Sequence, residues 1–364
     1  MAGIYVHVPF CHAKCAYCDF YSIARTGQAE AYVRALLDEH RQRLDENGGL
    51  PVKTLYLGGG TPSLLDAQHV ESIARRMLTA DTAEFTIEVN PEDVSPDKVR
   101  SWKDAGVNRV SMGVQSLVDD ELKAIRRRHS ARQALEAVET IQAAGIDNIS
   151  LDLIYGLPGQ TSESFISSAE GCVAAGARHL SAYLLSYEPG TLLSRRLAQG
   201  LVSEASDELV EDMYGRLCSL LAAAGYHHYE ISNFALPGFE SRHNSSYWDL
   251  TPYLGLGPSA HSLGADGVRR YHQADLRAYL TDPVQTVEES ESEEEKIDDI
   301  IIISLRRASG LDTDRIPEPY RSRLLESAAP HLAQGTLVAE GKIIKIPERH
   351  WLRADAVMRD LLVC

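Results

Sequence analysis

The stretch VHVPFCHAKCAYCDFYS, residues 6–22, places three of the chain's six cysteines close together, directly after a segment with the pattern of a β-strand. A disulfide framework uses an even number of cysteines, and a structural zinc site takes four ligands. Three thiols on one short loop leave a coordination position open on the group that they bind. This loop therefore decides which fold and which chemistry the rest of the chain has to support.

The spacing Cys11-x3-Cys15-x2-Cys18 allows three thiolates to bind one inorganic cluster. A cubane [4Fe–4S] cluster has four irons, so three cysteines leave one iron free for a substrate or a cofactor. The alternative is a zinc site completed by His7 or His12, which the short spacing without a second cysteine pair disfavours. The attachment motif of a c-type haem is excluded, because aspartate and not histidine follows the last cysteine of the loop.

The composition is that of an ordinary globular protein of 364 residues, long enough for one large domain and a smaller one or for two of similar size. The formal net charge of −16 repels a phosphate backbone and argues against nucleic acid as a partner. The chain starts without a signal-peptide pattern, and its longest aliphatic run, 300–305, is too short to span a bilayer. The other cysteines are scattered singly, as reduced thiols are, so we expect a cytoplasmic protein with no membrane span.

Up to about residue 186, the chain alternates between segments with strand patterns and segments with helix patterns. We predict strands at 4–8, 54–57, 85–89, 109–114, 149–154 and 179–185. Helical spacing of apolar residues occurs between them, for example at 31–44, 67–78, 131–144 and 164–175. This alternation is typical of β-α units and predicts a parallel sheet with right-handed crossovers, either doubly wound or rolled into a barrel.

Polar residues and glycines gather just after the predicted strands. They are the cysteine loop, residues 58–61, Glu88 with Asn90, Gln115, Asp152 and residues 187–188. In a β/α barrel the active site is built at this face, from the loops of several units. Any one of these residues alone would be an ordinary polar loop residue. Their coincidence at every predicted strand end indicates a functional site there.

The composition of the chain changes toward the C-terminus at the glutamate-rich segment EESESEEE, residues 288–295. Such a run is typical of a solvated linker or of an exposed helix start. A helical pattern at 297–307 and a final amphipathic pattern follow it, which predicts a small helical or winged-helix-like domain. We therefore divide the chain into a barrel with the cysteine loop (1–230), a segment that closes the barrel (231–286) and a C-terminal domain (287–364).

The cysteine spacing after the first strand resembles the signature of the radical S-adenosylmethionine superfamily. In that superfamily the methionine part of the cofactor chelates the open iron, and reduction of the cluster cleaves the cofactor to a 5′-deoxyadenosyl radical. The segment LYLGGGTPS, residues 55–63, agrees with this resemblance. Three glycines after the second strand let backbone amides approach the carboxylate and amino groups of the cofactor, although a glycine triplet alone would be weak evidence.

Further motifs, in order along nearly the whole chain, resemble the HemW family, haem chaperones related to oxygen-independent coproporphyrinogen III dehydrogenase (HemN). They are YVHVPFC (5–11), CAYCDFYS (15–22), GGGTPS (58–63), RVSMGVQS (109–116), DLIYGLPGQT (152–161), YEISNFA (229–235), RHNSSYW (242–248) and LGLGPSAHS (254–262). The resemblance implies a partial (β/α)6 barrel with a small C-terminal domain. It also implies a [4Fe–4S] cluster, S-adenosylmethionine, one bound haem, and haem-accepting proteins as partners.

The same resemblance implies which residues bind these cofactors. The cluster would be held by Cys11, Cys15 and Cys18. The S-adenosylmethionine site would be lined by Tyr5, Tyr17, Gly59, Gly60, Thr61, Glu88, Gln115, Arg127 and Asp152. The carboxylates and the amide in this set suit hydrogen bonds to ribose hydroxyls or to the amino group. The arginine lies in a run of three, residues 126–128, of which we expect at least two to form an ordinary solvated helix end.

The motif RHNSSYW supplies a haem site in this resemblance, with His243 for the iron and Tyr247 and Trp248 against the porphyrin. The alternative is a packed loop with an ordinary histidine, since haem pockets leave little trace in a sequence. His261 is a second candidate iron ligand. Because a carrier must release its cargo, we expect an accessible haem site and not an enclosed pocket.

Two departures separate this chain from relatives that oxidise porphyrinogens. Those relatives have the pattern CxxxCxxCxC, whereas Phe20 stands here at the position of the fourth cysteine. They also carry an N-terminal extension, whereas this chain has its cysteine loop by residue 11. We therefore expect a haem chaperone without coproporphyrinogen III dehydrogenase activity. The alternatives are an oxygen-independent coproporphyrinogen III oxidase, a decarboxylating radical enzyme, and a zinc-stabilised structural module.

Overall fold

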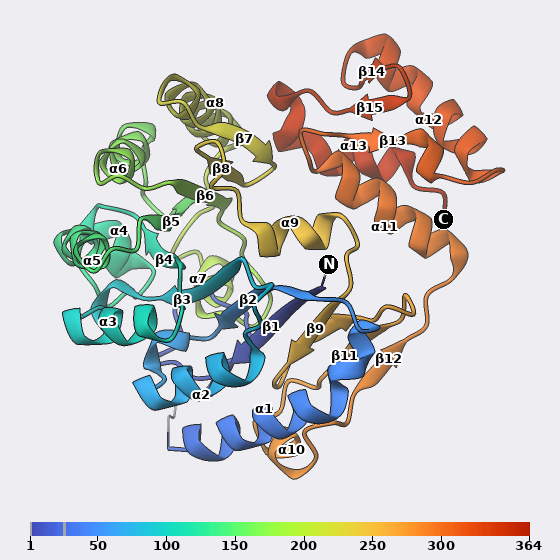
Figure 1. The fold of residues 1–364 in the computed structure, drawn as a ribbon. Helices are drawn as coiled ribbons and strands as arrows, with labels where there is room; N and C mark the ends of the chain where they lie inside the picture. The colour runs from blue at the N-terminus through green and yellow to red at the C-terminus, as the bar shows by residue number, and fades with distance from the viewer. Residues whose placement is uncertain (1, 25–26) are drawn as a thin grey trace.

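Six parallel strands form the centre of the large domain, and they lie side by side in chain order (Figure 1). The structure, a computed structural model, describes residues 2–24 and 27–364. The strands are β1 (Ala2–Val8), β2 (Val52–Gly59), β3 (Glu84–Val89), β4 (Arg109–Gln115), β5 (Asn148–Tyr155) and β6 (His179–Leu184). The six predicted strands are confirmed. Their buried side chains are largely valine, isoleucine and leucine, as in a parallel sheet that is covered by helices.

Helices connect these strands and lie on the outside of the sheet, and further helices come after β6 (Figure 1). They are α1 (Ala29–Arg43), α2 (Ala67–Met77), α3 (Pro96–Asp104), α4 (Asp119–Ala124), α5 (Ala131–Ala143), α6 (Ser162–Ala174), α7 (Leu192–Ala198), α8 (Asp207–Ala223) and α10 (Leu276–Thr281), with the 3-10 turns η1 (Leu44–Asn47), η2 (Pro62–Leu64) and η3 (Pro91–Asp93). The predicted helices are confirmed. Helices α5 and α6 begin with capping boxes at Ser130 and Thr161, which satisfy backbone N–H groups at the helix start.

Shorter strands extend the sheet at both edges and leave it open. They are β7 (His227–Glu230), β8 (Asn233–Ala235), β9 (Tyr253–Leu256), β10 (His261–Leu263), β11 (Arg269–Tyr271) and β12 (Val287–Glu289). The order of the 12-stranded sheet runs from β12 through β9 and β1 to β6, β8 and β7. Strand β9 pairs in parallel with β1, whereas the other added strands pair antiparallel. These strands are too short to show a hydrophobic period, and the sequence did not predict them.

The C-terminal part packs helices on a second, three-stranded sheet, at the upper right of Figure 1. It contains α11 (Glu293–Leu305), β13 (Leu311–Asp312), η4 (Thr313–Arg315), α12 (Tyr320–Gln334), β14 (Val338–Glu340), β15 (Ile343–Lys345), η5 (Glu348–Arg353) and α13 (Ala354–Leu361). The glutamate-rich segment supplies the end of β12 and the first turn of α11, where Ser292 and Glu295 form a capping box. The division of the chain into three parts stays a prediction.

Helix α9 (Arg242–Trp248) covers the end of the barrel that carries the N-terminal ends of the parallel strands. Thr54 Oγ1, near the start of β2, lies 2.8 Å from His243 Nδ1. Glu84, the first residue of β3, accepts a hydrogen bond from the backbone N–H of His243 at 3.0 Å. In Figure 1, α9 lies between the barrel strands and the C-terminal domain. The cysteine loop follows the opposite end of β1, so the two main sequence motifs lie at opposite ends of the barrel.

A buried ion pair ties α1 to the segment that begins with β9. Glu39 and Arg43 pair on α1, and their side chains are 0% and 4% exposed. Glu39 also accepts from Tyr279 Oη at 2.6 Å and from the backbone N–H of Gly257 at 3.0 Å. Arg43 donates to the carbonyl oxygen of Gly255, within β9, at 3.2 Å. Because both charges are buried and partnered, this pair holds β9 in place beside β1.

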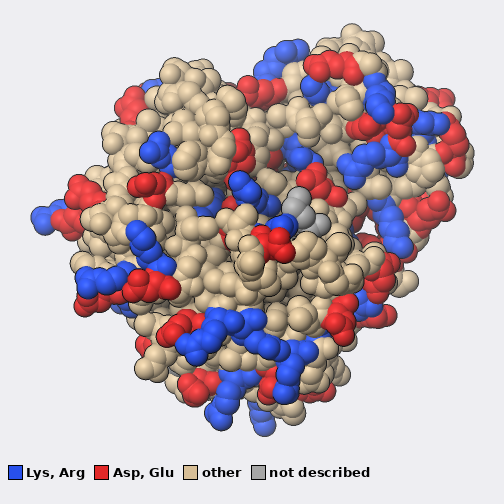
Figure 2. Space-filling view, viewed as in Figure 1, with Lys and Arg blue, Asp and Glu red and all other residues tan. Residues whose placement is uncertain are grey.

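The surface of the molecule carries mixed charges. Figure 2 shows acidic and basic side chains interspersed on the face in view, with a group of basic side chains over α1 and α2. None of the helices in the described ranges combines the length and the apolarity that a membrane span requires.

Replacement of Glu39 by alanine should lower the free energy of unfolding by about 3–5 kcal/mol, because it breaks the buried pair with Arg43 and leaves the Tyr279 hydroxyl and the Gly257 N–H without an acceptor. Urea unfolding followed by circular dichroism measures this loss. Asp38→Ala is the matched control, since Asp38 precedes it on the same helix and its side chain is 58% exposed. The control should change stability by at most about 1 kcal/mol. Equal losses for the two variants would contradict the role of the buried pair.

Candidate functional site

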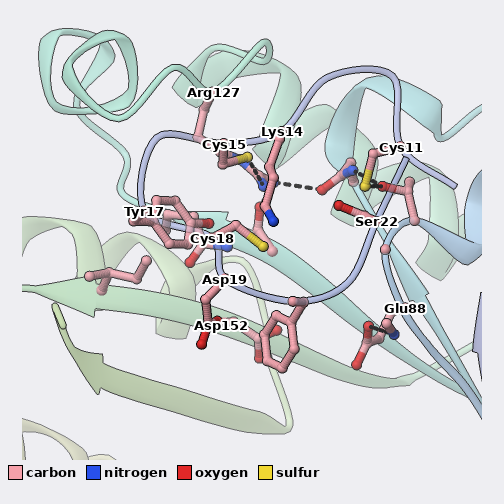
Figure 3. A pocket seen from close by; sticks show the side chains of 18 of the residues that line it. Cys11, Lys14, Cys15, Tyr17, Cys18, Asp19, Ser22, Glu88, Arg127 and Asp152 are labelled. Carbon is pink, nitrogen blue, oxygen red and sulfur yellow. Dashed lines mark hydrogen bonds between the residues drawn. The ribbon is translucent and has the colours of Figure 1, made fainter. Parts of the chain in front are cut away.

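A cavity of about 460 Å³ lies at the ends of the parallel strands, where the cysteine loop crosses them. Cys11, Cys15 and Cys18 all line this cavity, and Figure 3 shows their side chains around the same space. The ends of β2, β3, β4 and β5 supply further lining residues. The polar residues that follow separate strands in the sequence are thus brought together at one end of the barrel.

The cysteine loop lies close to the end of β2 because two glycines there have no side chain. Strands β1 and β2 pair with Val8 opposite Gly59, and the backbone N–H of Gly60 donates to Val8 O at 2.8 Å. A Cβ atom on Gly60 would lie 2.7 Å from the carbonyl oxygen of Phe10 and 3.2 Å from Cys11 Sγ. Gly59 has a φ of +104°, in a region that favours glycine. The glycine run therefore lets the loop pack directly on the strand end.

Each thiol of the loop has its own surroundings. Cys11 Sγ lies 3.3 Å from Thr61 Oγ1, and Arg127 Nη1 donates to Cys15 Sγ at 3.6 Å. Burial, with a smaller contribution from the two neighbouring thiols, raises the pKa of Cys18 to about 11. The free Cys18 thiol is therefore protonated at neutral pH, and a group that binds its sulfur has to displace this proton.

The three thiols do not have the arrangement of a single zinc ion's ligands. Sulfur atoms at about 2.3 Å around one zinc ion lie about 4 Å apart. Among the described residues, the three sulfurs of the loop are not all within 4.8 Å of one another. The candidate histidines have other partners, since His7 Nε2 lies 2.9 Å from the carbonyl oxygen of Tyr21 and His12 Nε2 lies 3.2 Å from Asp93 Oδ1. These distances favour a larger inorganic cluster over a zinc module.

Arg127 reaches the cavity from the turn after α4 (Figure 3). Its neighbour Arg126 has a φ of +60° at this turn, a backbone conformation that is uncommon outside glycine. Arg127 Nη2 donates to Asn90 Oδ1 at 2.7 Å and to the carbonyl oxygen of Gly113 at 2.5 Å. Arg126 and Arg128 are exposed, which confirms that at least two of the three arginines are solvated. Arg127 is the one that contacts the cysteine loop.

Two carboxyl groups face the cavity from β3 and β5. Glu88 accepts from Tyr56 Oη at 2.8 Å and from the backbone N–H of Gly59 at 3.0 Å. Burial nevertheless raises the pKa of Glu88 to about 7, so it is divided between its charged and neutral forms near neutral pH. Burial also raises the pKa of Asp152, although Ser111 Oγ lies 3.4 Å from its carboxylate. Carboxyl groups in this state suit the hydroxyl and amino groups of a polar ligand.

Most residues that the sequence predicts for the cofactor site line this cavity. They are Tyr17, Gly59, Gly60, Thr61, Glu88, Gln115, Arg127 and Asp152, together with the three cysteines. Gln115 is the last residue of β4, where it has a φ of +66° and the pairing with β5 shifts register. This change in the backbone turns its side chain toward the cavity. Tyr5 lies outside the lining, inside the barrel. Its hydroxyl is 3.2 Å from His7 Nδ1, and its ring packs near Tyr56.

Several lining residues were missed by sequence reasoning. Ser111, Gly113 and Tyr183 line the cavity and were not predicted, whereas Asn90, which the sequence indicated beside Glu88, holds Arg127. Strand periodicity is the signal that finds two of them, because Ser111 and Gly113 alternate with the predicted Gln115 along β4. The sequence holds no comparable signal for Tyr183, whose neighbourhood depends on how β6 lies beside β5.

The residues predicted to bind haem lie at the other end of the barrel. His243 is 0% exposed, and its ring stacks on Tyr56 with the centroids 5.0 Å apart. Both ring nitrogens have partners, since Nδ1 lies 2.8 Å from Thr54 Oγ1 and Nε2 lies 2.8 Å from Tyr247 Oη. Burial lowers the pKa of His243 to about 3, so the imidazole is neutral. In this conformation it has no free nitrogen, and the expected accessible site at His243 is not open.

The chain is similar to known proteins over almost its whole length. A family model described as the radical SAM superfamily matches residues 5–170. A protein of Lactococcus lactis named heme chaperone HemW is 38% identical, with 87% of this chain and 84% of the relative covered. The HemW proteins of Bacillus subtilis and Mycobacterium tuberculosis are each 36% identical, with 91% and 99% of this chain and 89% and 94% of the relatives covered. This chain belongs to the HemW family.

The fold agrees with HemW membership. A solved structure of coproporphyrinogen III oxidase (HemN) from Escherichia coli superimposes with a TM-score of 0.83 and covers 100% of this chain and 90% of its own. At 24% identity this likeness shows the fold alone. It confirms the fold class predicted from the sequence, a partial β/α barrel of the radical SAM type with a small C-terminal domain.

A radical SAM domain in a HemW protein implies a [4Fe–4S] cluster and S-adenosylmethionine as cofactors. The described residues fit both groups. The loop offers three thiols that are too dispersed for one metal ion, beside a cavity of about 460 Å³. Because Gly60 and Gly113 have no Cβ atom, Cys11 and the side chains of Gln115 and Arg127 can lie close to the strand ends at this cavity. When bound, the two cofactors supply reductive cleavage of the sulfonium. The chain itself would contribute thiolate ligands, a guanidinium beside Cys15, and carboxyl groups that could orient a polar ligand.

Gly60→Ala should displace the cysteine loop, because the added methyl group would lie 2.7 and 2.8 Å from the carbonyl oxygens of Phe10 and Val8. We expect the iron content after anaerobic reconstitution, about four per chain for one intact cluster, to fall several-fold. Gly215→Ala is the control, since a Cβ atom at this position of α8 meets nothing within 4 Å. Wild-type iron content in Gly60→Ala would refute the importance of this close approach.

Proposed function

We propose that this chain is a haem chaperone, which binds one haem, carries a [4Fe–4S] cluster with S-adenosylmethionine, and delivers haem to acceptor proteins. The proposal is supported by relatives named heme chaperone HemW, which align with 87%, 91% and 99% of this chain. All six cysteines are free thiols, which agrees with the cytoplasm as the proposed location.

Unsatisfied donors near α9 are the observation that carries the haem proposal. Arg109 is 1% exposed, and its Nε and Nη1 have no hydrogen-bond partner among the described residues. Trp248 Nε1 is buried without a partner in the same way. Buried donors of this kind are rare in folded proteins. Haem offers propionate carboxylates for a guanidinium and an iron for the imidazole of His243, so its chemistry matches the groups that meet here.

Haem binding at this end of the barrel requires α9 to move, because His243 is enclosed. The imidazole must release Thr54 or Tyr247 before it can bind iron, at a cost of about 1 kcal/mol for each hydrogen bond. Tyr247 and Trp248 would then pack against the porphyrin. The hydrogen bonds form again when haem leaves, so the closed form of α9 favours release, as a carrier requires.

His261 is the alternative iron ligand. It is exposed on β10, and its ring stacks on Tyr271 with the centroids 5.3 Å apart. No hydrogen bond occupies its ring nitrogens within the described part of the chain, so it is open to iron without any movement.

For the cavity, we propose Cys11, Cys15 and Cys18 as the ligands of the cluster. We propose that S-adenosylmethionine is bound there by Tyr17, Gly59, Gly60, Thr61, Glu88, Gln115, Arg127 and Asp152. The support is that all of these residues line one cavity beside the thiols. Tyr5 lies inside the barrel and would act on the ligand only through Glu88. Burial raises the pKa of the Tyr5 hydroxyl, and the charge of Glu88 raises it further.

We propose that the chain does not oxidise coproporphyrinogen III. Phe20 replaces the fourth cysteine of the oxidising relatives' motif, and its side chain is 64% exposed at the rim of the cavity. An apolar ring there offers neither a thiol ligand nor a redox-active group. The alternative function, an oxygen-independent coproporphyrinogen III oxidase, is therefore tested by an anaerobic assay for protoporphyrinogen IX with cluster, reductant and S-adenosylmethionine supplied.

Titration with hemin should give one Soret-absorbing complex per chain, and His243→Ala should weaken binding and alter the Soret band, because it removes the axial ligand. Haem transfer to an apo-haem protein should fall in the same variant. Cys11→Ala should lose the cluster and keep haem binding, since the cavity and α9 lie at opposite ends of the barrel.

His261→Ala is the matched control for this titration. Loss of the Soret band in His261→Ala but not in His243→Ala would move the iron ligand to β10. Wild-type binding and transfer in both variants would reject both ligands, and the absence of haem binding in the wild type would reject the chaperone function. Repeated turnover of coproporphyrinogen III would favour the oxidase.

The affinity for S-adenosylmethionine should rise with pH through about 7, because burial raises the pKa of Glu88 to about 7. Below this value the carboxyl is protonated and loses one acceptor, and above it the carboxylate accepts from the ligand. Binding to the reconstituted protein is measured by isothermal titration calorimetry from about pH 6 to about pH 8. Glu88→Gln, which cannot ionise, should bind more weakly and with a flat profile. The same pH dependence in the variant would assign the titration to another group.

A further inference from the structure

A thiol, an imidazole and a carboxylate meet at the junction of the barrel and the C-terminal domain, away from both sites described above. Cys218 on α8, His228 on β7 and Glu348 on η5 each offer one ligand atom, and these atoms all lie within 4.8 Å of one another. His228 Nδ1 lies 2.7 Å from Glu348 Oε1 and 3.9 Å from Cys218 Sγ. Figure 1 shows α8 and β7 on the side of the barrel that faces the C-terminal domain.

The geometry differs from that of a nucleophilic triad. In such a triad the thiol and the carboxylate use opposite nitrogens of the imidazole, so that a proton passes through the ring. Here Cys218 and Glu348 both approach Nδ1 of His228, and Nε2 faces the carbonyl oxygen of Ile231 at 3.4 Å. Three donor atoms that converge on one point are instead the arrangement of a metal site, with Ile231 as the outer partner that orients the ring.

The imidazole is held in this orientation by aromatic packing. The ring of His228 stacks on Phe234, with centroids 3.8 Å apart and an interplanar angle of 17°. Trp351, from the C-terminal domain, packs edge-on against the ring of His228, with the ring centroids 4.2 Å apart. The side chain of His228 is 6% exposed, whereas that of Glu348 is 52% exposed and leaves a path for an ion from solvent.

Tyr214 provides a second, independent indication of a ligand. Its hydroxyl is buried and has no hydrogen-bond partner of normal geometry among the described residues, and the residue as a whole is 6% exposed. The ring of Tyr214 lies edge-on to the imidazole of His228, with the centroids 5.9 Å apart, which places the residue beside the cluster. A bound cation would give this hydroxyl, directly or through a water, the partner that it lacks.

We propose that Cys218, His228 and Glu348 bind a divalent cation of the zinc class, which fastens the C-terminal domain to the barrel. One sulfur, one nitrogen and one carboxylate oxygen are a usual zinc ligand set, and a water or the Tyr214 hydroxyl completes the tetrahedron. Thiolate and carboxylate together balance the two positive charges of the ion. The site shares no residue with the cofactor cavity or with α9, so it is independent of the proposed function.

Binding releases one proton and involves no redox step. The thiol of Cys218 loses its proton to solvent as the sulfur–zinc bond forms. In the metal-free state the N–H of His228 Nδ1 donates a hydrogen bond to Glu348. When Nδ1 binds the metal, the ring carries its proton on Nε2 instead, and this N–H donates to the carbonyl oxygen of Ile231.

Equilibrium dialysis of the cluster-loaded protein against zinc chloride tests the proposal. Iron is counted in the same sample, so that the cysteine loop is known to be occupied. We expect one zinc per chain, at least tenfold weaker binding in Cys218→Ser and Glu348→Gln, and wild-type binding in Cys364→Ser, a control that changes an exposed thiol outside the cluster. X-ray absorption at the zinc edge should show one sulfur ligand, and zinc should raise the unfolding temperature of the wild type and of Cys364→Ser but not of the other two variants.

Three results would overturn the site. The first is less than stoichiometric zinc in wild-type protein whose cluster is intact. The second is stoichiometric zinc without a sulfur ligand, and the third is zinc that Cys218→Ser retains as firmly as Cys364→Ser does. Because Glu348 is exposed and lies at the start of a short 3-10 turn, its variant keeps the fold and remains informative if Cys218→Ser is unstable.

Discussion

The close approach of the cysteine loop to the end of β2 is the contact on which the rest of the site depends. The backbone N–H of Gly60 donates to the carbonyl oxygen of Val8, and no side chain can occupy the space between Gly60 and Cys11. This contact brings the thiols beside Thr61 and over the ends of the neighbouring strands. Parallel pairing in chain order then adds Glu88 and Asp152 to the same cavity, because the carboxyl ends of all these strands lie at one end of the barrel.

The two ends of the barrel are connected through its interior by a short run of side chains. The ring of His243 stacks on Tyr56, and Tyr56 Oη donates to Glu88, which lines the cavity. Movement of α9 therefore removes a packing partner from Tyr56, whose hydroxyl is one of two donors to Glu88. His243 on α9 and Glu88 in the cavity are thus connected by direct contacts through Tyr56.

Buried polar groups in this molecule fall into two kinds. Glu39 and Arg43 have partners for both charges, and such a group stabilises one arrangement of α1 and β9. Arg109 and Tyr214 have polar atoms without partners, which costs folding free energy unless another group satisfies them. The first kind belongs to the scaffold. The second kind lies beside α9 and beside Cys218, at the places proposed here for haem and for a divalent cation.

The sequence by itself determined the fold class and most of the cofactor cavity. Hydrophobic periodicity predicted the six central strands, because long buried strands repeat a simple pattern, and the spacing of Cys11, Cys15 and Cys18 is local along the chain. Residues that follow strands could be assigned to one site, since parallel strands place their ends together. The motifs also placed the chain with its relatives.

Only the tertiary structure decided what depends on contacts between distant segments. It enclosed His243 behind Thr54 and Tyr247, although the motif alone suggested an accessible ligand. It selected Arg127 from three adjacent arginines, because the turn at Arg126 directs that side chain to Asn90. It brought Cys218, His228 and Glu348 together from the barrel and the C-terminal domain, with a separation of 120 positions between the histidine and the glutamate. No periodicity or spacing records such a meeting, because packing between domains and not local pattern brings these side chains together.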